Sequence, residues 1–255
     1  LSISCSLLLL VIFSISHAQN IDWTPEEKNW IEQHQEISYG YEPHWEPYEI
    51  YENNEYSGIV GEYLDIISQQ TGITFNPIPN LTWKESLDGL KNGTIKMVPC
   101  CAITPGRRKY LKFSNVYIED DIVIVTRDDG PYLNNLNDLN NMSLALSRNY
   151  YTIEWIEKKY PKIDINKKGT IEDCLKSIVN GESQAFVGNL NVISYYINNM
   201  GYSNLKIVGT TDVNFGGIAM AVNPSHEMLT QIINKVLASI SSKQKHNIRK
   251  EWIAQ

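Results

Sequence analysis

The sequence predicts an α/β protein built from two similar lobes, and two observations support this. Stretches typical of strands and of amphipathic helices alternate along most of the 255 residues, the pattern of α/β units with parallel strands. One unit also recurs. The segment from Trp83 (WKESLDGLKNGTIKMV) aligns without gaps with the segment from Ile171 (IEDCLKSIVNGESQAF). Both have an acidic helix start, an Asn-Gly helix stop and a short strand, although such units also recur by chance in α/β proteins.

The predicted elements of the first part follow in chain order. Thr24 and Glu27 form a capping box and Pro25 occupies the first turn, so a short helix is expected within 22–34. Further helices are expected at 58–72, closed by Gly72, and at 83–92, ended by Gly93. Strands are expected at 36–41, 73–79, 95–101 and 121–127, and an irregular aromatic loop, GYEPHWEPYEIY, at 40–51.

The second part begins with a predicted strand at 142–146, a short loop, Ser147-Arg148-Asn149, and a helix. The first amides of a helix lack partners within the helix and lie at its positive end, so this loop is a candidate anion site. A strand at 216–222 and two helices within 225–253 complete the chain. Two such lobes would enclose a cleft, and clefts between domains are preferred sites for small ligands.

The charge distribution raises a question of function. The chain has 22 Lys and Arg against 29 Asp and Glu, a net charge of −7, which disfavours a nucleic-acid surface. Yet Arg107, Arg108, Lys109 and Lys112 cluster in the stretch ITPGRRKYLKFSNVY. The cluster is either a solvated loop or a socket for one small anion, and we favour the socket.

The first eighteen residues carry no charge and have an apolar centre at 6–15, followed by Ser16-His17-Ala18. This pattern predicts a signal peptide over 1–18 and export to the periplasm; an uncleaved membrane anchor is the alternative, although the apolar run is short for a span. Because the chain starts with Leu and lacks a basic leading segment, we expect it to be truncated at the front.

The cysteines show no spacing typical of a zinc site. Cys5 would leave with the signal peptide, and Cys100, Cys101 and Cys174 remain. An oxidising compartment permits a disulfide, but an odd number leaves at least one cysteine unpaired. Buried, inert thiols are therefore expected.

Six short motifs occur in a familiar order. They are W-x-P-Y (45–48), N-G-x-I-x-M-V-P (92–99), T-P-x-R-R (104–108), F-S-x-x-Y (113–117), V-G-N (187–189) and I-R-x-x-W (248–252). Together they resemble the family 3 extracellular solute-binding proteins, the Venus-flytrap type of periplasmic binding protein. The opening W-T-P-E-E-K-x-W-I-E-Q-H resembles flytrap domains that serve as sensor modules of bacterial membrane kinases. The resemblance covers roughly 21–253.

The resemblance implies a two-lobed, periplasmic-binding-protein-like (type II) fold with a hinge of two crossing strands. Lobe 1 would comprise 21–124 and 216–255, and lobe 2 would comprise 125–215, with crossings near Ile124 and Phe215. A ligand would lie between the lobes and close them.

The resemblance also implies the site. The arginine of the T-x-x-R pattern, here Arg107 with Thr104 beside it, would meet a ligand carboxylate through two parallel hydrogen bonds. Arg108, Lys109 and Lys112 would be solvated. The other candidate ligand residues are Trp45 and Tyr48, as apolar walls or as ordinary core, Tyr117, which follows Val116 where the family usually has proline, and Ser147, Asn149, Tyr150 and Asn189 from lobe 2.

Asn189 departs from the family pattern. Amino-acid binders of this family carry an acidic residue there, which holds the ligand's ammonium group, and an amide lacks that full negative charge. We therefore expect either a carboxylate ligand without an obligatory α-ammonium group or loose recognition of the ligand.

The implied function is ligand binding without catalysis, with an ABC permease or a membrane sensor kinase as partner. The alternative is a cyclic-carboxylate dehydratase-like enzyme on the same scaffold, for which Glu46, Glu49 and His44 are acid or base candidates. No nucleophile–histidine–carboxylate or phosphate-loop pattern is present, and we expect no cofactor and no metal. The run Glu119-Asp120-Asp121 is expected to be a solvated segment that leads into the hinge strand.

Overall fold

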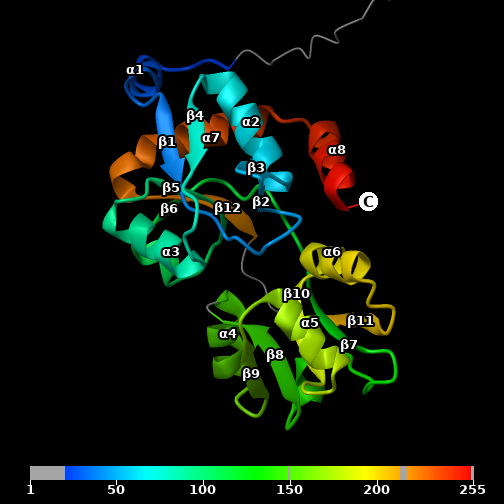
Figure 1. Cartoon of the computed structure of the whole chain (residues 1–255). Helices are drawn as coiled ribbons and strands as arrows, with labels where there is room; N and C mark the ends of the chain where they lie inside the picture. The colour runs from blue at the N-terminus through cyan, green and yellow to red at the C-terminus, as the bar shows by residue number, and fades with distance from the viewer. Residues whose placement is uncertain (1–20, 149, 213–216, 254–255) are drawn as a thin grey trace, which may run out of the picture.

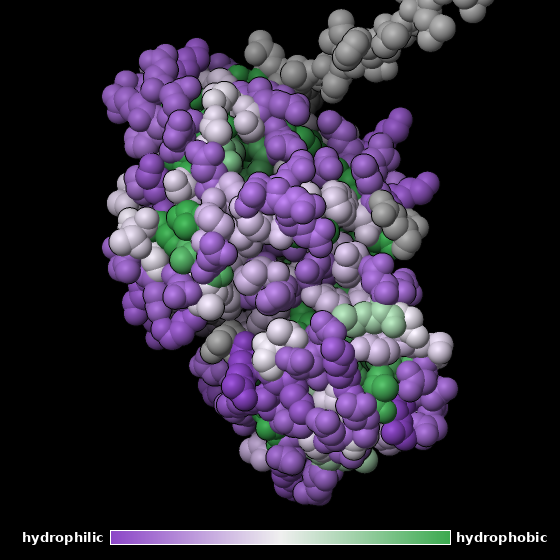
Figure 2. Space-filling view, viewed as in Figure 1, coloured by the Kyte–Doolittle hydropathy of each residue, from purple (hydrophilic) through white to green (hydrophobic). Residues whose placement is uncertain are grey.

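The computed structural model describes residues 21–148, 150–212 and 217–253. The expected signal peptide, Asn149 and the expected return crossing near Phe215 lie outside the described residues. Two lobes stand one above the other (Figure 1), and the first and last parts of the described chain share one lobe while the middle part forms the other. On the face shown in Figure 2, both lobes are covered mainly by hydrophilic side chains.

Lobe 1 is built on a sheet in the order β4-β1-β5-β12-β6. Its strands are β1 (Glu36–Tyr39), β4 (Thr74–Pro77), β5 (Met97–Ala102), β6 (Lys112–Phe113) and β12 (Ile218–Val222). The helices of this lobe are α1 (Pro25–Gln33), α2 (Ile59–Thr71), α3 (Trp83–Asn92), α7 (Glu227–Ser239) and α8 (Ser242–Ile253). β1 runs parallel to β4 and β5, whereas β12 returns antiparallel to β5, so the late part of the chain completes the sheet that the early part begins.

Lobe 2 has a second sheet, in the order β11-β7-β10-β8-β9. Its strands are β7 (Ile122–Arg127), β8 (Ser143–Ser147), β9 (Asp164–Lys168), β10 (Ala185–Asn189) and β11 (Leu205–Thr210), and its helices are α4 (Tyr151–Lys159), α5 (Ile171–Val179) and α6 (Leu190–Met200). The chain enters this sheet at Ile122, where β7 pairs with the end of β10, two residues before the crossing that we expected at Ile124.

The repeat seen in the sequence is present in the structure. α3 starts at a capping box made by Thr82 and Glu85, and α5 starts at a capping box made by Thr170 and Asp173. A glycine with positive φ, Gly93 or Gly181, follows each helix. Each unit then supplies a central strand, β5 or β10, to its own sheet.

A hairpin corrects one expectation. The aromatic loop was expected to be irregular through residue 51, but β2 (Ile50–Glu52) begins within it and pairs antiparallel with β3 (Glu55–Ser57). Asn53 and Asn54 form the turn with φ of 52° and 63°, the left-handed conformation that asparagine tolerates and that two-residue hairpin turns require. The Asn-Asn pair was the overlooked signal.

The core runs without a break from one lobe to the other. One cluster of buried residues includes Trp45, Tyr48 and Tyr117 of lobe 1 together with Phe186 and Tyr196 of lobe 2. Two smaller clusters fill the opposite face of each sheet. The lobes are therefore closed on each other along an apolar seam.

The three cysteines in the described part of the chain are free and buried, as expected. Cys100 belongs to the cluster on one face of β5 and Cys101 to the cluster on the other, because successive side chains of a strand point to opposite sides. No helix in the described ranges has the length and apolarity needed to cross a bilayer.

Two glycines allow a test of the helix boundaries. Gly72 ends α2 with φ of 76°, and a Cβ there would meet no atom within 4 Å, so Gly72→Ala should lower the free energy of unfolding by about 1 kcal/mol through backbone strain alone. Gly106 has φ of −63°, and Gly106→Ala should be neutral or stabilising by up to about 1 kcal/mol. Urea unfolding of both variants checks this, and equal effects would contradict it.

Candidate functional site

Three spaces between the lobes share lining residues. The middle one, called here the central pocket, is lined by Glu42, Trp45, Trp83, Ala102, Arg107, Tyr150 and Tyr151. It shares Ala102 and Tyr151 with a larger hinge cleft of about 860 Å³, and it shares Glu42, Trp83 and Tyr150 with a cleft mouth of about 460 Å³. The volume of the central pocket is about 10 Å³, roughly the minimum that holds one water molecule. In the arrangement described, the central pocket therefore has room for about one water molecule and for no larger ligand.

Arg107 supplies the positive charge of the central pocket. It lies in the 3₁₀ turn η1 (Arg107–Lys109), whose start is held by the Thr104 hydroxyl, which accepts the Arg107 backbone N–H at 3.2 Å. The guanidinium donates to the Ala102 carbonyl at 2.9 Å and to the Cys101 sulfur at 3.5 Å. Its central carbon lies 5.4 Å from the centre of the Trp83 ring, a cation–π contact.

This guanidinium is buried without an anionic partner. Arg107 is 8% exposed, and among the residues that the structure describes no carboxylate lies within 4.0 Å of it. Its cationic neighbours Arg108, Lys109 and Lys112 are exposed, as expected, and Lys112 pairs with Glu227 of α7. A buried cation is costly unless an opposite charge pairs with it, so this pocket suits an anion.

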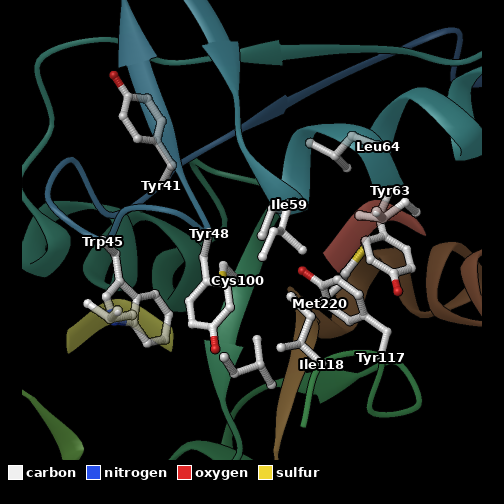
Figure 3. Packing of buried hydrophobic residues seen from close by; sticks show 14 of the residues in the cluster. Tyr41, Trp45, Tyr48, Ile59, Tyr63, Leu64, Cys100, Tyr117, Ile118 and Met220 are labelled. Atoms are coloured by element: carbon white, nitrogen blue, oxygen red, sulfur yellow. The ribbon is translucent and has the colours of Figure 1, made fainter. Parts of the chain in front are cut away.

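The loop between β1 and β2 forms the lobe 1 wall. Trp45 and Tyr48 extend from it in the same direction and Tyr41 extends in the opposite one (Figure 3). Trp45 packs edge-on against Tyr48, and its ring centre lies 6.3 Å from that of Tyr150 in lobe 2. Trp45 thus lines the pocket, while Tyr48, which packs against Trp45, does not.

Tyr48 and Glu46 instead join the lobes. The Tyr48 hydroxyl donates to the carboxylate of Asp120 and accepts from the Asn191 amide of α6 at 3.1 Å. The backbone N–H of Asn191 also donates to Asp120, at 3.2 Å. Burial raises the pKa of Asp120 to about 6, so this residue does not belong to a solvated segment. The hydroxyl of Tyr196 on α6 donates to Glu46.

Glu42 was missed by the sequence analysis. The residue lines both the central pocket and the cleft mouth, and burial raises the pKa of its carboxyl group to about 7. No Lys, Arg or His pairs with it within the described ranges. The residue lies three positions before Trp45, but nothing in the local pattern indicates that its side chain is buried.

The lobe 2 residues divide between the three spaces. Tyr150, at the start of α4, lines the central pocket, and Ser147 lines the cleft mouth. Asn189 lies in the hinge cleft, where its amide oxygen accepts a hydrogen bond from the Tyr151 hydroxyl at 3.1 Å. Tyr151 also lines the central pocket, so Asn189 contacts a wall residue of that pocket without lining it. The side chain of Tyr151 is a second lining residue that the sequence analysis did not single out.

Two of the remaining candidates, Tyr117 and Thr104, do not line the pocket. The Tyr117 hydroxyl donates to the Pro99 carbonyl at 2.9 Å, and its ring packs against Tyr63 with centres 4.8 Å apart. Thr104 holds the turn that carries Arg107. Trp83, by contrast, does line the pocket, although it is 24 positions from Arg107 in the sequence, and no local pattern joins the two.

The acid and base candidates of the alternative enzyme are also dispersed. Glu46 is bonded to Tyr196, Glu49 lies in the lobe 1 core, and His44 is exposed at the cleft mouth. Within the described ranges, no three His, Cys, Asp or Glu side chains gather closely enough to hold a metal ion.

The sequence matches the family described as bacterial extracellular solute-binding proteins, family 3, over residues 37–255. The chain belongs to this family. The fold agrees, since solved solute-binding and flytrap domains superpose on both of its lobes.

The similar proteins include sensor proteins. The chain is 26% identical over 231 residues to the virulence sensor protein BvgS of Bordetella pertussis, covering 90% of this chain and 19% of BvgS. The sensor protein EvgS of Escherichia coli O157:H7 is 26% identical, with 91% and 19% covered. The chain thus spans about a fifth of the length of these relatives. The crystal structure of the BvgS periplasmic VFT2 domain matches with a TM-score of 0.82 at 26% identity, over 91% of this chain and 99% of that domain.

A transport protein is also similar. The ABC transporter arginine-binding protein 1 of Escherichia coli K12 is 23% identical and covers 87% of this chain, while the chain covers 92% of it. The matched parts of these relatives include solute-binding proteins and sensor domains.

The raised pKa of Glu42 makes the stability of the fold depend on pH. Its folded pKa of about 7 exceeds its ordinary value of 4.5, so protonation favours the folded state. Stability from this group should fall as pH rises from 4.5 through 7, by an amount on the order of 3 kcal/mol. Glu42→Gln should remove this dependence of the free energy of unfolding on pH. The matched control is Glu55→Gln at the exposed hairpin, which should retain it. Urea unfolding between pH 4.5 and 8 measures this, and parallel profiles for wild type and Glu42→Gln would refute it.

Proposed function

We propose that the chain captures a small carboxylate-bearing molecule, an amino acid or a related organic acid, between its two lobes. The observation that carries this proposal is the buried Arg107 guanidinium, which faces the interlobe pocket without a carboxylate partner among the described residues. The Ala102 carbonyl and the Trp83 ring already fix its orientation. Pre-orientation of this kind reduces the entropy lost when a ligand binds.

The chemistry of the pocket fits such a ligand. A guanidinium binds a carboxylate through two parallel hydrogen bonds, and each charged hydrogen bond contributes roughly 1.5–3 kcal/mol. Aromatic rings from both lobes, those of Trp45, Trp83, Tyr150 and Tyr151, surround the charge, so the rest of the ligand would meet apolar walls. The Glu42 carboxyl group would meet a hydrogen-bond donor or a cationic group at the ligand's other end.

Closure of the two lobes on the ligand would signal that the ligand is bound. A molecule that bridges Arg107 of lobe 1 and Tyr150 or Tyr151 of lobe 2 binds the closed arrangement better than an open one, and it shifts the equilibrium by that difference in affinity. We propose a periplasmic location and a sensing role next to a membrane sensor kinase, since the sensor relatives match at slightly higher identity than the transport protein. An ABC permease is the alternative partner.

The charge of Arg107 can be removed with little change in its packing. Arg107→Met retains methylene groups over Trp83 and should abolish the thermal shift that a carboxylate gives to the wild-type protein. A ligand at 100 times its dissociation constant stabilises a protein by about 2.7 kcal/mol. The screen uses amino acids and aromatic and aliphatic carboxylates. Arg108→Met, at the exposed neighbour, is the matched control and should respond as wild type does. An undiminished shift in Arg107→Met would end the proposal.

Asn189 leads to a prediction about the ligand's amine. An amide at this position, with its oxygen engaged by Tyr151, does not supply the full charge that holds an ammonium group. Pairs of ligands that differ only by the α-amine, such as phenylalanine and 3-phenylpropionate, should therefore bind within about tenfold of each other. Asn189→Asp should favour the amine-bearing member. Calorimetry with both proteins measures the ratio, and a strict requirement for the amine in the wild-type protein would show the idea to be wrong.

A further inference from the structure

Glu49 is a buried carboxylate that the proposed ligand site does not use directly. It is 1% exposed and lies just before β2 in the lobe 1 core. No Lys, Arg or His pairs with it in the described part of the chain, and burial raises its pKa well above the ordinary value. Since burying a carboxyl group is costly unless it is hydrogen-bonded, its hydrogen bonds indicate what it does.

Both oxygens of Glu49 accept a hydrogen bond. One accepts the backbone N–H of Glu42 at 3.0 Å, and the other accepts the Tyr56 hydroxyl at 2.7 Å. Tyr56 belongs to β3, and its ring packs edge-on against Tyr39 of β1 with centres 5.2 Å apart. A chain of contacts therefore runs from the core strand β1, through the β2–β3 hairpin, to the backbone of a residue that lines the central pocket.

The other anchors of the same loop lie on either side of Glu42. Before it, the backbone N–H of Gly40 donates to the Met97 carbonyl at 3.1 Å, and the Ser86 hydroxyl donates to the Tyr41 carbonyl at 3.3 Å. Beyond it, the first amides of α2 donate to the carbonyls of Pro47 and Tyr48. Glu42 lines the central pocket. Its backbone N–H donates to the Glu49 carboxyl group and not to a backbone carbonyl.

We propose that Glu49 is a positioning residue of the interlobe site, which fixes the backbone of Glu42 and thereby sets where the Glu42 carboxyl group stands in the pocket that Arg107 also lines. The inference deepens the proposed function and rests on it for its biological meaning. The contact itself can be tested without any ligand. Glu49 itself does not line the pocket and acts only through the Glu42 backbone.

The test is amide hydrogen exchange measured by NMR on the free protein. The exchange rate of the Glu42 N–H is compared with that of the Gly40 N–H in the same molecule, because a general loss of stability accelerates both. In Glu49→Leu the Glu42 amide loses its acceptor, and its rate relative to Gly40 should rise at least tenfold. Glu49→Gln retains one oxygen to accept the Glu42 N–H, and its amide NH₂ group can donate to the Tyr56 hydroxyl. The relative exchange rate of the Glu42 N–H in this variant should stay within about threefold of wild type.

Tyr56→Phe is a milder variant in case Glu49→Leu does not fold. It leaves Glu49 with one of its two donors, and the relative Glu42 rate should rise severalfold. A second readout is the pKa of the Glu42 side chain, followed by ¹³C NMR. Release of the loop should move this pKa from about 7 toward its ordinary 4.5 in Glu49→Leu and Tyr56→Phe, and should leave it unchanged in Glu49→Gln.

Asn223→Ala is the control for a merely structural effect. Asn223 is buried in lobe 1, its amide donates to the Leu90 carbonyl at 2.7 Å, and it lines none of the three interlobe spaces. This variant should destabilise the lobe without changing the ratio of the two exchange rates. A Glu42 amide that is as protected in Glu49→Leu and Tyr56→Phe as in wild type would overturn the proposal, as would an Asn223→Ala effect of equal size. Failure of the carboxylate proposal would leave these rates untouched, so the two hypotheses fail separately.

Discussion

The structure depends on the closure of two lobes around a guanidinium with no carboxylate partner in the described part of the chain. Arg107 is held from behind by the end of β5 and by Trp83, so its charge has a fixed position before any ligand arrives. Lobe 2 covers it with Tyr150 and Tyr151. The central pocket has room for about one water molecule, and in such surroundings a charge interacts more strongly with a partner than it does in bulk water.

The loop after β1 gives the cleft its lobe 1 wall and its contacts with lobe 2. Glu42 and Trp45 face the pocket, whereas Glu46 and Tyr48 reach α6 through Tyr196 and Asn191. One short segment therefore supplies both lining residues of the central pocket and contacts that join the lobes. A ligand that displaces Trp45 or Glu42 would also disturb those contacts, because the side chains share one backbone.

Much of the architecture was predictable because its signals are local. The capping box of Thr24 and Glu27, the glycine ends of α2 and α3, and the repeated Asn-Gly unit each act within a few residues of the helix that they define. The hairpin turn at Asn53-Asn54 was also local, and it was overlooked because prolines and aromatics dominate the stretch before it. Arg107 and Trp45 were identified through short motifs. Such motifs can be recognised by their order along the chain even when the residues that they contain are far apart in the sequence.

The sequence by itself determined the α/β elements, the two-lobed family and the identity of the cationic residue in the central pocket. Only the tertiary structure decided which other residues share the pocket with that cation. Trp83 and Glu42 come from separate segments of lobe 1, and Tyr151 comes from lobe 2. Tyr48 and Tyr117, also aromatic, turn to other partners. The physical reason is that capping and periodicity act over a few residues, whereas burial depends on which distant surfaces the two sheets bring together.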